Sequence, residues 1–124
     1  MYNLHLSPEQ LEIRDMVRDF VAREVKPAAL AVDRMESGER PLLLEQIEQA
    51  SQLGLRALAL SQEAGGAGAD TLTCCIVAEE LAAGDPDIAA VLAQTWMMAQ
   101  RHGRDAGHAA PEIRARRACL PAFR

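Results

Sequence analysis

The stretch SPEQLEIRDMVRDFVAREVKP, residues 7–27, decides the fold class of this chain. Ser7 can cap a helix, Pro8 suits the first helical position, and Gln10 completes a capping box with Ser7. Apolar residues then recur at three- and four-residue spacing, at Ile13, Met16, Val17, Phe20 and Val21. The pattern predicts an amphipathic helix of about five turns. Pro27 is expected to kink or end this helix and to push Lys26 toward an extended conformation.

Helix start and stop signals predict four more helices in the rest of the chain. These are expected over residues 42–53, from 70 or 71 to about 83, from 87 to about 102, and from 111 to about 119. Gly54 is the expected stop of the second helix. The run 55–60 is compatible with an extended or a helical conformation, because periodicity does not decide for so short a segment. Five helices with short connections predict an all-α, up-and-down bundle forming one domain over residues 1–124.

Composition agrees with a helical domain and excludes several classes of protein. The 124 residues include 23 alanines and only 3% aromatic residues, which favours packed helices over sheets. Lys plus Arg is 13 and Asp plus Glu is 18, so the net charge is 13 − 18 = −5. An acidic chain without a basic block is a poor nucleic-acid binder. No apolar run is long enough to span a membrane, and residues 1–5 do not resemble a signal peptide.

The three cysteines, Cys74, Cys75 and Cys119, do not form a disulfide framework, because their number is odd and two are adjacent. A reducing, cytoplasmic location is the simplest expectation. Cys74 and Cys75 are interpreted as small apolar filling on a helix. No histidine shares metal-ligand spacing with another ligand, so we expect no metal site.

Two further features have both a functional and a structural interpretation. The glycine-rich run 63–69 could cradle a phosphate, but it matches no nucleotide-binding fingerprint, and a turn that needs positive φ is the favoured interpretation. Glu79 and Glu80 are adjacent on a helix and point about 100° apart, so one is expected to pack near a partner while the other is solvated. No catalytic pair of carboxylates is therefore expected.

The segment Trp96-Met97-Met98 carries large, adaptable apolar side chains near the end of a helix. Such side chains usually fill a core, and they can also line a pocket for an aliphatic ligand. From the residues alone, the sequence predicts a helical domain with no self-contained catalytic group.

The order of several short motifs resembles the N-terminal helical domain of the acyl-CoA dehydrogenase family. These motifs are Leu6-Ser7-Pro8-Glu9-Gln10, Arg18-Asp19-Phe20-Val21, Val25-Lys26-Pro27, Asp33, Gln52-Leu53-Gly54-Leu55, Glu63-Ala64-Gly65-Gly66-Ala67-Gly68 and Val77-Ala78-Glu79-Glu80-Leu81-Ala82. The resemblance covers about residues 4 to 100, and the run 117–121 is similar to the family's link into its next domain.

The resemblance implies a protein of three domains, of which this chain would hold the first and lack the middle β domain and the C-terminal helical domain. FAD would bind between the two missing domains, and a glutamate of the C-terminal domain would remove the α-proton of an acyl-CoA. The flavin would then accept the β-hydride to give a trans-2-enoyl product. Alone, the chain is expected to bind no flavin and to be inactive.

In the family, the N-terminal domain supplies a wall of the acyl-chain pocket. By position on the helix from Asp87 to about Gln100, the resemblance implies that Ala93, Gln94 and Met97 face the acyl tail. Ala93 would leave depth for a longer or branched tail, and Met97 would adapt to its shape.

Two alternatives stay open. The chain could be a stand-alone helical interaction module that binds a partner or itself through an exposed apolar patch formed by Leu55, Leu58, Leu60 and the Trp96 region. Related flavoproteins of similar build also act as oxidases or monooxygenases.

Overall fold

The computed structural model describes residues 5–33 and 41–106. Their elements are α1 (Pro8–Phe20), a π-helical turn η1 (Val21–Val25), α2 (Lys26–Asp33), α3 (Leu44–Gln52), 3-10 turns η2 (Leu55–Ala57) and η3 (Gln62–Ala64), α4 (Thr71–Ala82) and α5 (Pro86–Ala106). No strand occurs among these residues. The expected helix over residues 111–119 lies outside them.

The capping box predicted at the start of α1 is confirmed. The Ser7 hydroxyl accepts a hydrogen bond from the Gln10 backbone N–H (3.2 Å), and the Gln10 side-chain oxygen accepts one from the Ser7 N–H (3.0 Å). Val17 and Phe20 on the apolar face are buried. This face therefore anchors α1 to the core, as its spacing predicts.

The helix does not end at Pro27, and the expectation of an extended Lys26 is wrong. Lys26 has helical dihedral angles (φ −58°, ψ −46°), and its N–H donates to the carbonyl of Val21, five residues back. Proline removes one backbone donor, and its ring crowds the carbonyl four residues before it. The π-helical turn widens the backbone just before Pro27, so that the helix continues into α2.

The next segment turns at Gly54. Helix α3 begins two residues later than expected and is followed by Gly54, which has a φ of +82° and is the predicted stop. The residues that follow form η2 rather than a strand. This resolves the ambiguity of the run 55–60 in favour of a helical turn.

Helices α4 and α5 form a hairpin. Asp70 caps α4 through a hydrogen bond from the Thr73 N–H (2.8 Å), as expected from the sequence. Buried Asp85 caps α5 by accepting hydrogen bonds from the N–H groups of Asp87 (2.9 Å) and Ile88 (3.0 Å). Helix α5 starts one residue earlier than expected, at Pro86, and continues to Ala106, beyond the predicted end.

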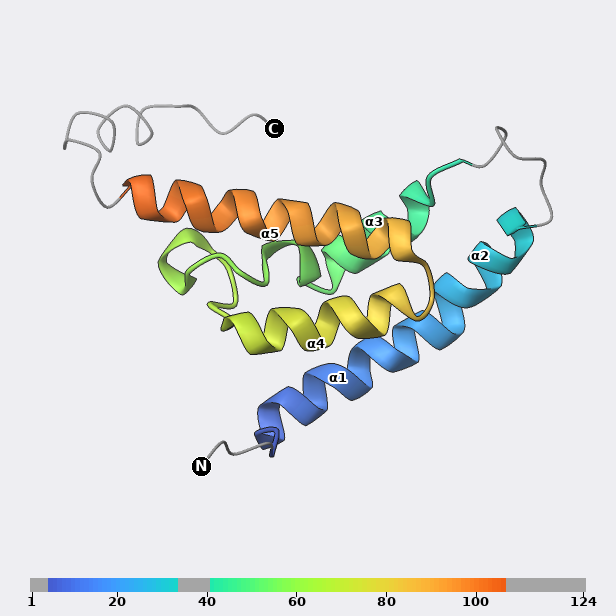
Figure 1. Ribbon diagram of the computed structural model, residues 1–124, viewed down its shortest axis with the longest axis horizontal. Coiled ribbons are helices and arrows are strands. Elements are labelled where there is room, and N and C mark those ends of the chain that lie inside the picture. The colour runs from blue at the N-terminus through green and yellow to red at the C-terminus, as the bar shows by residue number, and fades with distance from the viewer. Residues whose placement is uncertain (1–4, 34–40, 107–124) are drawn as a thin grey trace.

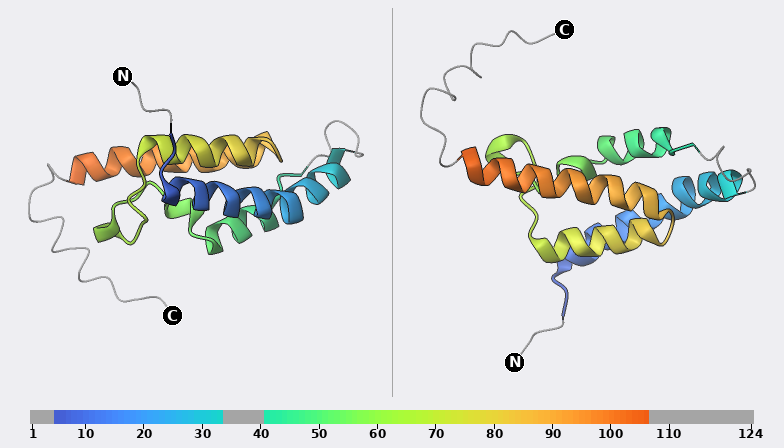
Figure 2. Two further views of the ribbon diagram at one scale, coloured as in Figure 1. Left: turned by 90° about the horizontal axis from the view of Figure 1, so that it is seen from below. Right: turned by 45° about the horizontal axis from the view of Figure 1, so that its top comes forward.

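Helices α1 and α2 run in the same direction as one rod, and α3, α4 and α5 then alternate in direction, so the predicted all-α, up-and-down arrangement is confirmed (Figure 1). Helix α4 lies between the α1 rod and α5, and α3 lies behind α5 in the view of Figure 1, with η2 contacting both α3 and α5 (Figures 1 and 2). The side chains that are buried almost completely and have the largest volumes come from α1, η1, η2, α4 and α5: Val17, Val25, Leu55, Val77, Leu81, Ile88 and Leu92. Within the described ranges, no helix is both long enough and apolar enough to pass through a bilayer.

Candidate functional site

A shallow apolar groove of about 170 Å³ runs between α4 and α5, and we call it the α4–α5 groove. Four of its lining residues come from α4 and four from α5: Thr71, Cys74, Cys75, Ala78, Ala93, Trp96, Met97 and Gln100. They recur at three- and four-residue intervals on each helix, so each helix presents one face to the groove. The groove is therefore built by regular helical geometry rather than by a loop.

The antiparallel packing of the two helices gives the groove a polar end and an apolar end. Thr71 near the start of α4 lies at the same end as Gln100 toward the end of α5. Ala78 and Ala93 lie at the other end, where two small side chains oppose each other. An apolar ligand with one polar end is the kind of molecule that this gradient suits.

Trp96 forms the floor of the α4–α5 groove. Its side chain lines the groove but is only 4% exposed, and neighbouring Cys74 is 8% exposed. The indole Nε1–H of Trp96 donates a hydrogen bond of 2.7 Å to the backbone carbonyl of Leu55, 41 residues earlier in the chain. A buried indole needs such a partner, and this one holds the ring in a single orientation.

The patch proposed for an interaction module is wrong in its residues. Leu55 (1% exposed), Leu58 (4%) and Trp96 are buried, and Leu60 is half-buried, because η2 packs against α5. The apolar character of this run therefore serves the core. Met97 and Met98, next to Trp96, are exposed, so only the tryptophan of that trio is core.

The structure brings two of the three residues implied for the acyl tail to the α4–α5 groove. Ala93 is half-buried, and Met97 is 54% exposed on the rim. Gln94 is exposed and is not among the groove residues. Sequence reasoning missed the α4 side, although Thr71, Cys75 and Ala78 share one helical face at intervals of four and three residues.

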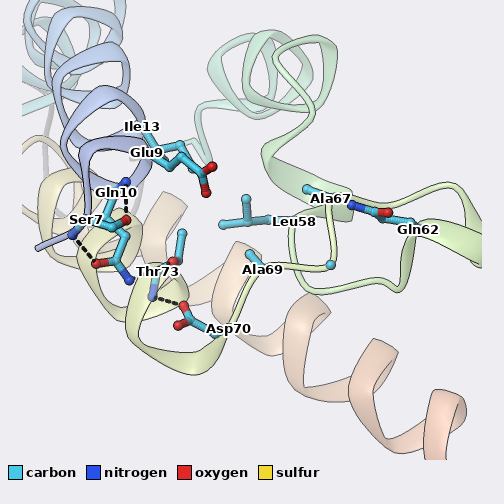
Figure 3. A pocket seen from close by; sticks show the side chains of 11 residues that line it. Ser7, Glu9, Gln10, Ile13, Leu58, Gln62, Ala67, Ala69, Asp70 and Thr73 are labelled. Carbon is cyan, nitrogen blue, oxygen red and sulfur yellow. Dashed lines mark hydrogen bonds between the residues drawn. The ribbon is translucent and has the colours of Figure 1, made fainter.

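A second, larger hollow of about 390 Å³ lies where the start of α1 meets the start of α4 and the segment 58–69. Figure 3 shows Glu9 and Ile13 of α1 on one side of it and Leu58 and Ala69 on the other. Its polar groups bond to one another: Gln10 Nε2 donates to the Thr73 hydroxyl (3.3 Å). The hydrogen bonds that Asp70 accepts from Thr73 lower the pKa of its carboxyl. This hollow is best explained as the junction between two capped helices.

The glycine-rich run is a turn, and its backbone amides are not available for a phosphate. The amides of residues 65–69 donate to backbone carbonyls of residues 57–62 over distances of 2.7–3.3 Å. Gly65 (φ +87°) and Gly68 (φ +65°) adopt left-handed conformations. A phosphate-binding loop needs free N–H groups that converge on the anion, which this turn lacks.

The paired carboxylates divide as predicted. Glu80 accepts two hydrogen bonds from the Arg18 guanidinium (3.1 and 2.6 Å), which link α4 to α1, while Glu79 is exposed. The hydrogen bond from Arg18 lowers the pKa of Glu80. Glu80 is therefore a structural anion rather than a proton acceptor for a reaction.

The adjacent cysteines differ in their surroundings. Cys74 is buried, and desolvation raises the pKa of its thiol. Cys75 is exposed on the groove rim, so the expectation that both fill a core is wrong for Cys75. Adjacent helical positions point about 100° apart, which turns one inward and the other outward. Across the described residues, no group of three or more His, Cys, Asp or Glu side chains is placed to hold a metal.

Comparison with known proteins gives matches over most of the chain. The family model of the acyl-CoA dehydrogenase N-terminal domain matches residues 7–109. The short-chain specific acyl-CoA dehydrogenase of Clostridium acetobutylicum is 38% identical over 79 residues, which are 64% of this chain and 20% of that protein. The probable acyl-CoA dehydrogenase YngJ of Bacillus subtilis is 35% identical over 79 residues, again 64% of this chain and 20% of that protein.

Another acyl-CoA dehydrogenase of Bacillus subtilis is 33% identical over 78 residues, which are 63% of this chain and 20% of that protein. The matched part of the chain thus spans about a fifth of the length of these relatives.

Proposed function

Because the chain belongs to the acyl-CoA dehydrogenase family through its N-terminal domain, we propose that it forms one wall of the acyl-tail site of an acyl-CoA dehydrogenase-like oxidoreductase. The complete protein would remove a proton and a hydride across the Cα–Cβ bond of an acyl-CoA. The wall would be the α4–α5 groove, with Ala93 and Met97 facing the tail and Gln94 at its margin.

One observation carries this proposal: two of the three residues that family position assigns to the tail lie on an apolar groove. Ala93 and Met97 come from α5, one turn apart, and the α4 side adds Cys75 and Ala78. Burying a methylene group of a tail against such a surface is worth about 0.8 kcal/mol. Met97 is exposed and unbranched, so it can follow the shape of the tail.

Flavin adenine dinucleotide, which the family uses, does not fit the residues described here. The hollow of about 390 Å³ is lined by Glu9 and Asp70 and has no Lys or Arg among its lining residues, so a pyrophosphate would meet only negative charge there. A third hollow is lined in part by Asp85 and Asp87 and also has no Lys or Arg among its lining residues. The α4–α5 groove is lined by no charged side chain.

We therefore assign no flavin contact and no chemical step to these residues. The chain by itself is proposed to be colourless and inactive, with flavin and base supplied by further domains. The two described cysteines are free thiols, which supports a cytoplasmic location.

A hybrid enzyme tests the proposed wall. This chain replaces the matching N-terminal segment of the Clostridium acetobutylicum relative, and acyl-CoA-dependent dye reduction is measured for straight-chain substrates of increasing length. Ala93→Leu adds three carbons to the groove and is expected to lower kcat/KM for the longer substrates about 10-fold more than for butyryl-CoA.

Ala31→Leu is the matched control, because Ala31 is an exposed alanine on α2, away from the groove. It is expected to leave the chain-length profile unchanged. An Ala93→Leu enzyme with the parental profile would contradict the proposal.

A further inference from the structure

We propose that Trp96 is a specificity-determining residue that makes the α4–α5 groove accept unbranched tails lying along the helices and exclude branched ones. The inference rests on the function proposed above and deepens it. It also reverses the expectation that Ala93 leaves depth for a branched tail, because the space beneath the groove is occupied by an aromatic ring.

The position of Trp96 limits how deep a tail can go. The ring lines the groove while 96% of the residue is shielded from solvent, so it separates the groove from the core. Cys74 beside it is also buried. A methyl branch that points inward would therefore meet these two side chains.

The ring cannot readily move aside. Its Nε1–H is bonded to the Leu55 carbonyl at 2.7 Å, and Leu55 is itself only 1% exposed. Rotating the ring would break a buried hydrogen bond and leave the indole N–H without this acceptor, which is unfavourable in a buried site. Trp96 therefore acts as a fixed floor.

The remaining dimensions fit an extended tail. The lining residues span eight positions on each helix, from 71 to 78 and from 93 to 100, and seven steps of the helical rise make about 10 Å. The polar side chains Thr71 and Gln100 lie at one end, where the thioester end of the tail would lie. The terminal methyl group would then lie near Ala78 and Ala93.

Protection of Cys75 measures occupancy of the groove in the purified chain. Cys75 is exposed on the rim, so its alkylation by iodoacetamide should slow when a tail is bound. The rate at Cys75 is read by tandem mass spectrometry, separately from the other cysteines. The probes are octanoyl-CoA, 4-methyloctanoyl-CoA and, as a blank, CoA.

Octanoyl-CoA is expected to protect Cys75 at a concentration about 10-fold lower than 4-methyloctanoyl-CoA. In Trp96→Leu this ratio is expected to fall to near one, while Trp96→Phe keeps a ring and a ratio of about 3 or more. If octanoyl-CoA protects Cys75 but the ratio is near one in the parent chain or unchanged in Trp96→Leu, the role of Trp96 is overturned. If no acyl-CoA protects Cys75, the proposed function itself fails.

A measurement on the unaltered chain decides the matter if the variants do not fold. Trp96 is the only tryptophan, so fluorescence at its emission wavelength reports on this position alone. A bromine atom quenches tryptophan at close contact, and 8-bromooctanoyl-CoA is expected to quench it at the concentrations that protect Cys75. Protection without quenching would show that the tail does not lie on Trp96 and would overturn the inference.

Discussion

Replacing Gly66 by alanine should destabilise the fold far more than the same change at Gly65. A Cβ at Gly66 would overlap the Cβ and carbonyl oxygen of Leu60 and approach the carbonyl oxygen of Ala57. At Gly65 a Cβ would meet nothing within 4 Å, although the φ of +87° is unfavourable for alanine. Comparing the two variants therefore separates the destabilisation caused by steric crowding from that caused by an unfavourable backbone conformation.

The magnitudes follow from these contacts. Overpacking costs about 1–3 kcal/mol, and here the crowded atoms include backbone oxygens that cannot rotate away. The same two carbonyls accept hydrogen bonds from Ala67 (3.3 Å) and Gly68 (2.7 Å), and losing them adds about 1 kcal/mol each. We expect Gly66→Ala to lower the free energy of unfolding by about 3–4 kcal/mol. Gly65→Ala should lower it by about 1–2 kcal/mol, which is the cost of placing alanine in a left-handed conformation.

Urea unfolding of the purified chain, followed by circular dichroism at 222 nm, measures both variants. The expected difference in the free energy of unfolding is about 2 kcal/mol, well above the error of comparing midpoints. Equal midpoints for the two variants would refute the reasoning, because crowding against the run 57–60 would then contribute nothing. A phosphate-dependent midpoint in the parent chain would argue against the purely structural role of the turn.

Three further predictions concern the helix contacts. Leu81→Ala, at a side chain with no exposure, should cost about 2–5 kcal/mol in thermal unfolding, whereas Leu72→Ala, 52% exposed, should change little. Asp85→Ala removes the acceptor at the start of α5 and should cost about 0.5–2 kcal/mol in urea unfolding, with Asp85→Asn close to the parent. Glu80→Gln should lower Tm near neutral pH. The pKa of Glu80 is lower in the folded state than its unfolded value near 4.3, so the ionised carboxylate stabilises the fold above that unfolded pKa. This stabilisation is lost as the pH falls through the folded-state pKa, so the effect of Glu80→Gln should vanish in acid. A Tm difference that is the same at pH 7 and pH 2.5 would contradict the role of the Arg18 bond.

The parts of the fold that local chemistry controls were predictable. Ser7, Asp70 and Gly54 act at helix ends through their own side chain or backbone freedom, and each does what its residue type predicts. The spacing of apolar residues likewise identified the buried face of α1. Such signals need no knowledge of the rest of the chain.

The errors arose where the outcome depends on an irregular backbone turn or on a partner far along the chain. Lys26 stays helical because the turn before Pro27 is π-helical, which a residue pattern does not reveal. Leu55 and Trp96 are buried against each other across 41 residues, so an apolar run that could have been a surface patch belongs to the core. Local propensity is weak against such tertiary packing.

The candidate site was predicted from one side only. Family position pointed to Ala93, Gln94 and Met97 on α5, and of these Ala93 and Met97 line the groove. The α4 side of the groove, with Cys75 and Ala78, depends on the register between two antiparallel helices. That register is set by the packing of buried side chains and cannot be read from either helix alone.

Photo-crosslinking of the purified chain with an octanoyl-CoA whose tail ends in a diazirine tests most directly whether the α4–α5 groove is an acyl-tail wall. The account predicts labels at Ala93, Met97 and their groove neighbours on α4, with excess octanoyl-CoA preventing them. Labels confined to α1, α2 or α3, or labels that octanoyl-CoA does not displace, would contradict it.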